Sequence, residues 1–236
     1  MKRVPTAELL DVDAGTSAEI FASVRDLDRI NRWFGGIHTS QALVGRVARV
    51  AGLARISLLE VAAGSGNTAV AVQQRLDHEG LRIDLTLLDR ADSHFAKGAP
   101  DSLRSRKFVS GDALHLPFRD ESFDVVSCNL FVHHLSPQQV VQFVLEALRV
   151  CRQAVVINDV SRSWLHLAFV YLGMPLFRSR ITWHDAPASV RQAYTSDEIK
   201  TLLDQSNTAR VEIGSHFLFR IGAIAWKSGQ DESRYV

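Results

Sequence analysis

Five short apolar runs, rich in leucine and β-branched residues, are spaced along the chain with helix-length segments between them. Runs without polar alternation predict strands of a parallel sheet that is buried on both faces. The predicted strands are Ile56–Val61, Ile83–Leu88, Lys107–Ser110, Phe123–Cys128 and Ala154–Ile157. The pattern therefore predicts an α/β domain in which helices cover both faces of a mostly parallel sheet.

Helical spacing of apolar positions fills two of the intervening segments, Thr68–Leu76 and Val140–Leu148. Two capping boxes mark helix starts. One begins at Ser136, with proline at the first helical position, and the other begins at Thr195. The second box predicts a helix that runs through Leu203.

The last part of the chain predicts two further strands, Arg210–Ile213 and Phe217–Trp226, joined by a short turn at Gly214-Ser-His216. Strands linked this closely form an antiparallel hairpin. We expect the hairpin at the edge of the sheet, where it brings the five predicted strands to seven.

Two segments lie outside the predicted sheet, residues 1–50 and residues 161–194. The first is expected to be a helical lid, with amphipathic stretches from Ile20 to about Trp33 and from Ser40 to Val50. The second is rich in aromatic residues and histidine, and it is expected to cover the substrate, because ligands of open α/β sheets lie beyond the carboxyl ends of the strands. We therefore expect a single domain over 1–236, with the binding core at 51–160 and a closing helix and hairpin at 195–236.

Composition adds several exclusions to this picture. The formal net charge is +1 and no basic stripe is interleaved with aromatic residues, so a nucleic-acid partner is not expected. Cys128 and Cys151 lie in apolar stretches and are expected to be core residues. The longest apolar stretch, Trp164 to Phe177, is too short to span a bilayer, so no membrane insertion is expected. The amino terminus lacks an apolar signal core, which favours a cytoplasmic protein.

A glycine-containing loop follows the first predicted strand. The strand ends at Glu60, and the chain then turns through Ala62-Ala-Gly64-Ser65-Gly66 into a helix. Glycine permits a tight turn and a close backbone approach to a ligand, and the helix start offers free N–H groups. The same residues satisfy the Gly-x-Gly-x-x-Ala form of the dinucleotide fingerprint, so the loop alone indicates only a nucleotide-like ligand.

Carboxylates at the next two strand ends make this signal more specific. Asp89 closes the second strand 23 residues after Gly66, where a ribose diol would lie. Asp112 follows the third strand at the same edge of the sheet, and an adenine amino group is a suitable donor to its carboxylate.

With these residues the chain resembles the class I S-adenosylmethionine-dependent methyltransferases, in particular their small-molecule branch, over roughly residues 55–160. The motifs that carry the resemblance are Leu58-Leu-Glu-Val-Ala-Ala-Gly-Ser-Gly66, Leu87-Leu-Asp89, Gly111-Asp-Ala-Leu-His-Leu-Pro-Phe118 and Ser122-Phe-Asp-Val-Val126. The resemblance implies a Rossmann-like sheet and S-adenosylmethionine as the cofactor.

The resemblance also implies roles for individual residues. The loop with Gly64, Ser65 and Gly66 would hold the methionine part of the cofactor, and Asp89 the ribose hydroxyls. Asp112 and Ala113 would bind the adenine. Glu60, Arg90 and Asn129 are also expected at the cofactor. Apart from the resemblance, Arg32 in the amino-terminal lid is a candidate to reach the cofactor carboxylate; alternatively it is a solvated or structural arginine. Ala62 stands where the family often has glycine, which an ordinary backbone conformation would tolerate.

The segment after the fourth strand carries the candidate catalytic residues, His133 and His134. Histidine can accept the proton of a phenol or hydroxyl near neutral pH. Because adjacent residues on a helix point about 100° apart, we expect at most one of the two to face the site, with a preference for His134. Alternatively, both have only a structural role. No metal is expected, because adjacent histidines make poor joint ligands.

The lid segments supply flat apolar surface with a few polar groups, which suits a planar aromatic or polyketide-type acceptor. The candidates are Trp33, Phe34, His38, Trp164, His166, Tyr171, Trp183, His184 and Arg191. The sequence therefore predicts a methyltransferase acting on a small molecule, with O-methylation preferred over C-methylation of a quinone precursor. A nicotinamide-dependent oxidoreductase and a non-catalytic cofactor-binding protein are the alternatives, and the oligomeric state stays open.

Overall fold

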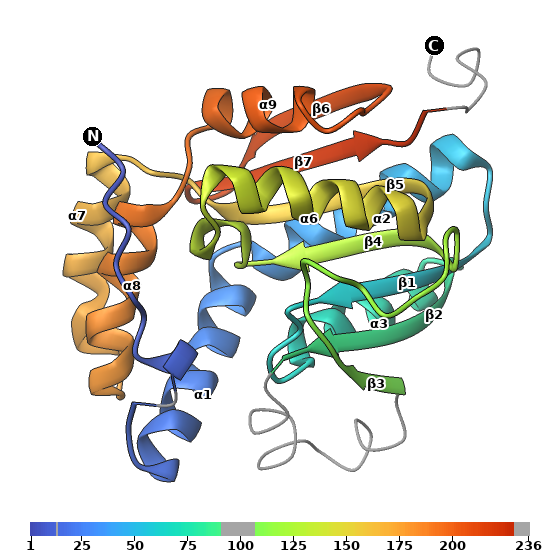
Figure 1. The fold of residues 1–236 in the computed structure, drawn as a ribbon. Helices are drawn as coiled ribbons and strands as arrows, with labels where there is room; N and C mark the ends of the chain where they lie inside the picture. Colours follow the sequence, from blue (N-terminus) through green and yellow to red (C-terminus); the bar gives the residue numbers. More distant parts are fainter. Residues whose placement is uncertain (13, 91–106, 229–236) are drawn as a thin grey trace.

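The computed structural model describes residues 1–12, 14–90 and 107–228. Seven strands form one sheet in the order β3-β2-β1-β4-β5-β7-β6 (Figure 1). Strands β1 to β5 are parallel, and β7 lies antiparallel between β5 and β6. The strands are β1 (Arg55–Val61), β2 (Arg82–Asp89), β3 (Lys107–Ser110), β4 (Phe123–Asn129), β5 (Cys151–Val160), β6 (Arg210–His216) and β7 (Arg220–Trp226). The predicted Rossmann-like sheet with an antiparallel edge hairpin is confirmed.

The hairpin turns at a different place from the one predicted. β6 continues through the predicted turn at Gly214-Ser-His216, and the chain reverses at residues 217–219. Gly214 pairs with Gly222 across the ladder, and a Cβ atom at position 222 would lie 2.5 Å from the His216 ring. The glycine at 222 therefore makes room for a side chain, while Leu218 and Phe219 turn the chain with positive φ angles.

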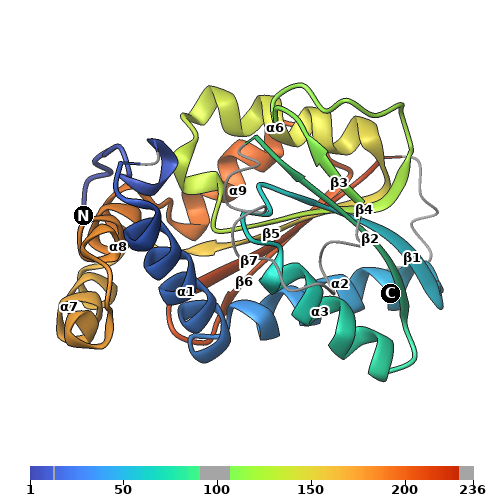
Figure 2. The ribbon, with the colours of Figure 1, turned by 90° about the horizontal axis from the view of Figure 1, so that it is seen from below.

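Helices cover both faces of the sheet, as the apolar strands require (Figure 2). Helices α2 (Gly36–Ala51) and α3 (Asn67–His78) share one buried apolar cluster with the sheet, and α6 (Pro137–Val150) and α9 (Ser196–Asp204) share another. The two predicted capping boxes are present at the starts of α6 and α9. Each face of the sheet is thus sealed by two helices.

The amino-terminal region is only partly a lid, which corrects the expectation for residues 1–50. Helix α2 buries Leu43, Val44 and Val47 against the sheet and so belongs to the core. Helix α1 (Ser17–Trp33), by contrast, stands at the end of the sheet toward which β4 points (Figure 1). Its buried side chains are polar, in keeping with a position beside a ligand site.

Helices α7 (Trp164–Gly173) and α8 (Arg180–Gln192) lie at the same end of the sheet as α1 (Figures 1 and 2). Short 3-10 helices complete this region: η1 (Leu10–Val12), η2 (Val132–His134) and η3 (Met174–Leu176). A buried hydrogen bond of 3.1 Å joins the Ser23 hydroxyl of α1 to the Thr182 hydroxyl of α8. Helices α1, α7 and α8, with the short 3-10 helices, therefore form one wall beyond the carboxyl ends of the strands.

The first twelve residues run across this wall. The Arg3 guanidinium donates to the carbonyl oxygens of Gln192, His133 and Leu135, at 2.6, 2.9 and 2.9 Å. The backbone N–H groups of residues 9 and 10 donate to the Asp185 carboxylate of α8. The amino-terminal segment is thus tied to both α8 and η2.

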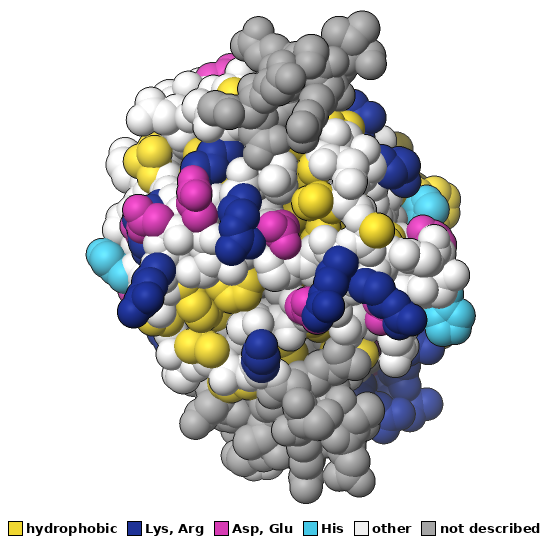
Figure 3. Space-filling view, turned by 90° about the vertical axis from the view of Figure 1, so that its right-hand side faces the viewer, with side chains coloured by type: hydrophobic (Ala, Val, Ile, Leu, Met, Phe, Trp, Pro, Cys, Tyr) yellow, Lys and Arg dark blue, Asp and Glu magenta, His cyan; other side chains and the backbone are white. Residues whose placement is uncertain are grey.

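On the face shown in Figure 3, basic and acidic side chains alternate across the centre. Exposed ion pairs such as Arg55–Asp84, at 2.7 Å, are typical of this pattern. No helix in the described part of the chain is long and apolar enough to cross a membrane.

Candidate functional site

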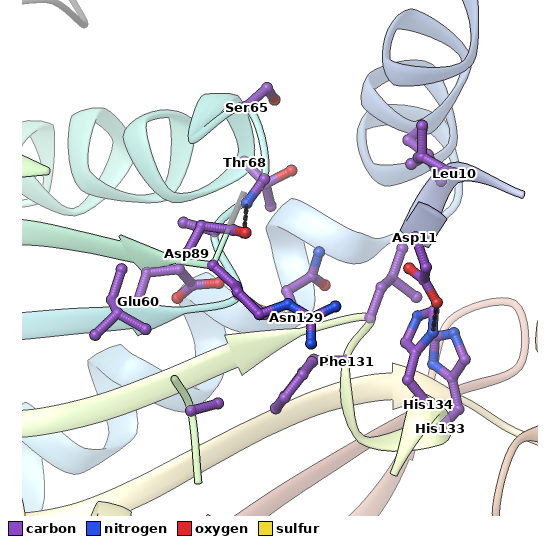
Figure 4. A pocket seen from close by; sticks show the side chains of 18 of the residues that line it. Leu10, Asp11, Glu60, Ser65, Thr68, Asp89, Asn129, Phe131, His133 and His134 are labelled. Atoms are coloured by element: carbon purple, nitrogen blue, oxygen red, sulfur yellow. Dashed lines mark hydrogen bonds and ion pairs between the residues drawn. The ribbon is translucent and has the colours of Figure 1, made fainter. Parts of the chain in front are cut away.

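A cavity of about 470 Å³ opens at the carboxyl ends of β1, β2 and β4 (Figure 4). We call it the first cavity. It is lined by most of the residues that the sequence predicted for the cofactor and for catalysis: Glu60, Ala62, Gly64, Ser65, Asp89, Arg90, Asp112, Ala113, Asn129, His133 and His134. The topology brings them together because parallel strands all end at this edge of the sheet.

The loop after β1 is shaped to admit a ligand. Gly64 has a φ of +53°, and a Cβ atom built there would meet nothing within 4 Å, so this backbone faces open space. Its N–H donates to the Asp89 carboxylate at 2.7 Å. Gly66, with a φ of +75°, is the N-cap of α3 and supports the loop without lining the cavity. A nucleoside with an attached amino acid fits this combination of open backbone, helix start and carboxylates.

Ala62 does not have the ordinary backbone conformation that would tolerate a methyl group. Its φ is +54°, in the left-handed region that favours glycine. A neighbouring hydrogen bond maintains this conformation of Ala62. The Ala63 N–H donates to the Leu88 carbonyl at 3.0 Å and fixes the loop against β2. The expectation for Ala62 is thus corrected: the alanine adds backbone strain at this turn.

Glu60 is a buried carboxyl group at the end of β1, 7% exposed. Burial raises its pKa to about 7, although the Ser127 hydroxyl on β4 donates a hydrogen bond to it. Asp112 is the opposite case, since it is exposed and its carboxylate accepts the Leu114 N–H at 2.9 Å. That hydrogen bond lowers the pKa of Asp112. The carboxyl group of Glu60 therefore favours its neutral form, and that of Asp112, at the exposed end of the cavity, favours its ionised form.

Arg32, which was expected to reach the cofactor, is not among the residues that line the first cavity. It is exposed, and α1 presents Asp28 and Asn31 to the cavity instead. The Asp28 carboxylate accepts hydrogen bonds from the Asn67 amide at 2.7 Å and the Ser65 hydroxyl at 3.4 Å. Helix α1 is thereby tied to the loop that follows β1.

Asn129 belongs to a buried polar network behind the cavity. Its amide donates to Asn31 Oδ1 at 3.2 Å. The buried Arg220 guanidinium donates to Asn31 Oδ1 at 2.9 Å and to Asn129 Oδ1 at 3.3 Å. Burial lowers the pKa of Arg220 to about 10, which still leaves the group charged near neutral pH. The network fixes the orientation of both asparagine side chains.

Both His133 and His134 line the first cavity, contrary to the expectation that at most one would face it (Figure 4). They lie on the 3-10 helix η2 of three residues, and their ring centroids are 4.1 Å apart with an interplanar angle of 35°. The divergence of about 100° per residue applies to the backbone of a regular helix. On this short turn the side chains fold back and lie side by side.

Carboxylates surround the two imidazoles. His133 Nδ1 lies 2.6 Å from the Asp159 carboxylate and Nε2 lies 3.5 Å from the Glu8 carboxylate. Burial disfavours the charged imidazole, but the two carboxylates outweigh it and raise the pKa of His133 to about 10. His134 Nδ1 lies 2.8 Å from the Asp11 carboxylate, and His134 is the more exposed of the pair.

A second cavity, of about 370 Å³ and mostly apolar, adjoins the first. The two share Glu8, Leu10, Leu27, Leu130 and Ser189 as lining residues. Most of its remaining lining comes from α1, α7, η3, α8 and the hairpin turn. A molecule in the second cavity would therefore lie directly beside one in the first.

Only two of the predicted acceptor residues, Phe34 and His166, line the second cavity. The other seven lie outside its lining: Trp33, His38, Trp164, Tyr171, Trp183, His184 and Arg191. Trp164 on α7 is 69% exposed, and the Arg191 guanidinium donates to the Tyr171 hydroxyl at 2.5 Å. The aromatic composition of the lid was thus a poor guide to which side chains face inward.

Sequence reasoning missed Glu8, Asp11, Asp28 and Asn31. Glu8 and Asp11 belong to a segment without periodicity that approaches the site only through tertiary contacts. Asp28 and Asn31 lie three residues apart on α1, and this spacing on one helix face was the only available signal.

Comparison with known proteins agrees with this geometry. Residues 59–157 match the family model described as a methyltransferase domain. An uncharacterised methyltransferase, YcgJ of Bacillus subtilis (strain 168), is 34% identical over 98 residues, which are 41% of this chain and 36% of that relative. The match therefore spans only about a third of that protein.

Two longer similarities extend over most of the chain. The ubiquinone/menaquinone biosynthesis C-methyltransferase UbiE of Xanthomonas campestris pv. campestris is 25% identical over 212 residues, which cover 81% of each chain. A crystal structure of the plantazolicin methyltransferase BpumL, in complex with a monoazolic desmethylPZN analog and SAH, has a TM-score of 0.67 at 14% identity. It covers 93% of this chain and 92% of that one, and shows a shared fold. The family match identifies residues 59–157 as a methyltransferase domain, and the fold and the loop after β1 are those of a class I S-adenosylmethionine-dependent methyltransferase, with S-adenosylmethionine as the cofactor.

Proposed function

We propose that the chain transfers the methyl group of S-adenosylmethionine to a small, largely apolar ring-bearing molecule held in the second cavity. The observation that carries this proposal is the shared wall between the two cavities at Glu8, Leu10, Leu27, Leu130 and Ser189. Methyl transfer needs the acceptor atom in line with the methyl–sulfur bond, so donor and acceptor sites must adjoin. An apolar cavity with few polar groups suits an organic ring.

In this proposal the residues of the first cavity bind the cofactor. Asp89 accepts hydrogen bonds from the ribose hydroxyls, and Asp112 with Ala113 binds the adenine at the exposed end. The open backbone at Gly64 and Ser65 receives the methionine part. Glu60, Arg90, Asn31 and Asn129 shape the walls, and Asn31 takes the place that was expected for Arg32.

The cofactor supplies a methyl group that is already electrophilic, so the protein has to align the acceptor and manage its proton. As the acceptor oxygen bonds to the methyl carbon, the methyl–sulfur bond breaks and its electron pair stays on sulfur. We assign the acceptor proton to His134, which is the more exposed histidine and lines the first cavity. His133 already carries a proton between two carboxylates, so it positions the cluster and does not act as a base.

C-methylation is the second candidate. It is favoured by the similarity to UbiE, whose name describes a C-methyltransferase of ubiquinone and menaquinone biosynthesis. The same apolar cavity would accept a quinone precursor, and loss of the phenolic proton would equally activate a ring carbon. Product analysis separates the two, because an O-methyl ether and a C-methyl ring have different fragmentation and NMR spectra.

Cofactor selectivity is the first test. S-adenosylhomocysteine should raise the melting temperature, by an amount equivalent to about 2.7 kcal/mol at a hundred times its Kd, whereas NAD(H) should not. Asp89→Ala should abolish the shift. Stabilisation by NAD(H) alone would support an oxidoreductase instead.

Turnover is the second test. Wild-type protein, His134→Ala and the control His78→Ala are assayed for transfer of labelled methyl to a panel of phenols and quinone precursors. His78 lies at the exposed end of α3, so its variant should keep wild-type activity. His134→Ala should lose at least about 100-fold in kcat with S-adenosylhomocysteine binding retained. Cofactor binding without turnover on any acceptor would favour a binding protein.

A further inference from the structure

We infer that Glu8, His133 and His134 form a binding site for a divalent transition-metal ion. Each offers one ligand atom, and the three atoms lie within 4.8 Å of one another. The residues come from two segments that are distant in the sequence, the amino-terminal segment and η2. No metal was expected because adjacent histidines make poor joint ligands and no cluster of further ligands accompanies them in the sequence, whereas here the two rings lie side by side and Glu8 adjoins them.

The distances match shared ligation better than direct hydrogen bonding. His133 Nε2 lies 3.5 Å from Glu8 Oε1, and His134 Nε2 lies 4.0 Å from Glu8 Oε2. A good N–H···O hydrogen bond brings these atoms to about 2.9 Å. Ligands about 2.0–2.2 Å from a tetrahedral ion lie roughly 3.4 Å from each other. Small side-chain adjustments, with release to solvent of the proton on His133 Nε2, would therefore bring all three atoms onto one ion.

Each of the three candidate ligands also makes hydrogen bonds that fix its orientation. His133 Nδ1 is 2.6 Å from Asp159, and His134 Nδ1 is 2.8 Å from Asp11, which leaves both Nε2 atoms directed toward Glu8. Glu8 Oε1 accepts hydrogen bonds from the Ser189 hydroxyl at 2.6 Å and the Gln192 amide at 2.8 Å. Histidines that bind metals usually donate their other ring N–H to a carboxylate, and ligating carboxylates are themselves hydrogen-bonded. All three residues meet this condition.

The charge and composition of the cluster indicate the class of ion. Three carboxylates, those of Glu8, Asp11 and Asp159, surround two imidazoles, so positive charge between the rings is stabilised. Two imidazoles with one carboxylate suit Zn²⁺, Fe²⁺, Co²⁺ or Ni²⁺ better than Mg²⁺ or Ca²⁺, which prefer oxygen ligands. Three protein ligands leave a coordination position open toward the cavity, as catalytic sites do.

The ion would lie where the two cavities meet, because Glu8 lines both of them. Its catalytic role rests on the proposed function, whereas its binding does not. An acceptor oxygen on the open position would lose its proton more readily, since a bound dication stabilises the oxyanion. In the loaded enzyme His134 would then be a ligand, and the proton would leave to solvent.

The binding test uses Zn²⁺ and Co²⁺ directly. The protein is treated with a chelator, dialysed, and titrated with Co²⁺ while its visible absorption is followed. Zn²⁺ is titrated in competition with a chromophoric chelator. We expect about one ion per chain, with an intense absorption typical of a tetrahedral Co²⁺ site. Glu8→Gln and His134→Ala should each weaken Zn²⁺ binding at least about tenfold. His78→Ala is the matched control and should bind as wild type does.

A third variant separates loss of metal binding from loss of folding. Asp11 is half-exposed and only orients His134, so Asp11→Asn should fold normally and still weaken Zn²⁺ binding several-fold. Retention of the S-adenosylhomocysteine thermal shift confirms that a variant is folded. Absence of stoichiometric Zn²⁺ and Co²⁺ binding, or binding that all three variants leave unchanged, overturns the metal site.

The methyl-transfer assay distinguishes this proposal from the proposed function. Stoichiometric metal binding with no turnover on any acceptor would uphold the site and reject the methyl-transfer proposal. Turnover that resists the chelator, in protein that binds no metal, would uphold methyl transfer and reject the metal site.

Discussion

Ala62 and Glu60 lie two residues apart at the carboxyl end of β1, and both are held in conditions that cost stability. Ala62 has a left-handed backbone conformation, and Glu60 is a carboxyl group without a cationic partner among its described contacts. Residues under such strain concentrate at functional sites, where the surrounding structure compensates for them. Each of the two supports a separate prediction.

Replacing Ala62 with glycine should stabilise the protein. A left-handed conformation costs an alanine roughly 1–2 kcal/mol, part of which returns as lost chain entropy when glycine is introduced, so the net gain should be about 1 kcal/mol. The free energy of unfolding in urea measures it. Ala63→Gly is the matched control, because Ala63 is not among the residues with positive φ and its replacement should destabilise. Equal effects at both positions would contradict this account of Ala62.

Glu60→Gln should change how stability depends on pH. The folded protein keeps the Glu60 proton up to about pH 7, whereas the unfolded chain releases it near pH 4.5. Between these values the folded state binds more protons, so this group makes the free energy of unfolding fall as the pH rises. The full shift corresponds to about 3 kcal/mol.

Urea unfolding of the cofactor-free protein between pH 4.5 and 8 tests this. Glutamine can still accept the Ser127 hydrogen bond and carries no charge. The free energy of unfolding of the variant should therefore increase relative to that of the wild type as the pH rises. Parallel stability curves for the two proteins would show that Glu60 has an ordinary pKa.

At the scale of elements, α1 is the part of the wall that couples the lid to the cofactor loop. Its carboxylate Asp28 accepts hydrogen bonds from Asn67 and Ser65, and its Asp26 carboxylate accepts the N–H groups of Arg178 and Ser179 before α8. Helix α1 is thus fixed at one side to the loop after β1 and at the other to the start of α8.

Asp28→Ala should weaken S-adenosylhomocysteine binding about tenfold. Hydrogen bonds to a charged group contribute roughly 1.5–3 kcal/mol, and in the variant water replaces part of this contribution by hydrogen bonding to Asn67 and Ser65. Isothermal titration gives the affinity. Asp204→Ala is the control, since Asp204 is an exposed residue at the end of α9 that pairs with Lys200. If the two variants bind equally well, α1 does not organise the loop.

At the scale of the whole molecule, the sheet was largely predictable and the lid was not. Apolar runs and capping boxes depend on neighbours in the sequence, so the five parallel strands and the starts of α6 and α9 follow from local pattern. The prediction of a turn at Gly214 was wrong because this glycine lies within β6 and pairs with Gly222 of β7. That pairing is a tertiary contact and has no local sequence pattern.

The candidate site divides in the same way. Residues at strand ends, such as Asp89 and Asp112, could be predicted to lie together because the ends of parallel strands meet at one edge of the sheet. Glu8 and Asp11 could not be found, because their partners lie more than 120 residues away and no periodic pattern marks the segment. Arg32 was chosen for its charge, but the turn of α1 directs Asp28 and Asn31 to the cavity instead.

The contacts of the amino-terminal segment also have a consequence for synthesis on the ribosome. Two of the partners of Glu8, Ser189 and Gln192, are made some 180 residues later than Glu8 itself. At a translation rate of about 5–20 residues per second, these partners are synthesised roughly 10–40 s after Glu8. A nascent chain can therefore pair its first strands long before this wall exists. A message broken before the codons for α8 would yield a protein with β1 to β5 and no closed site.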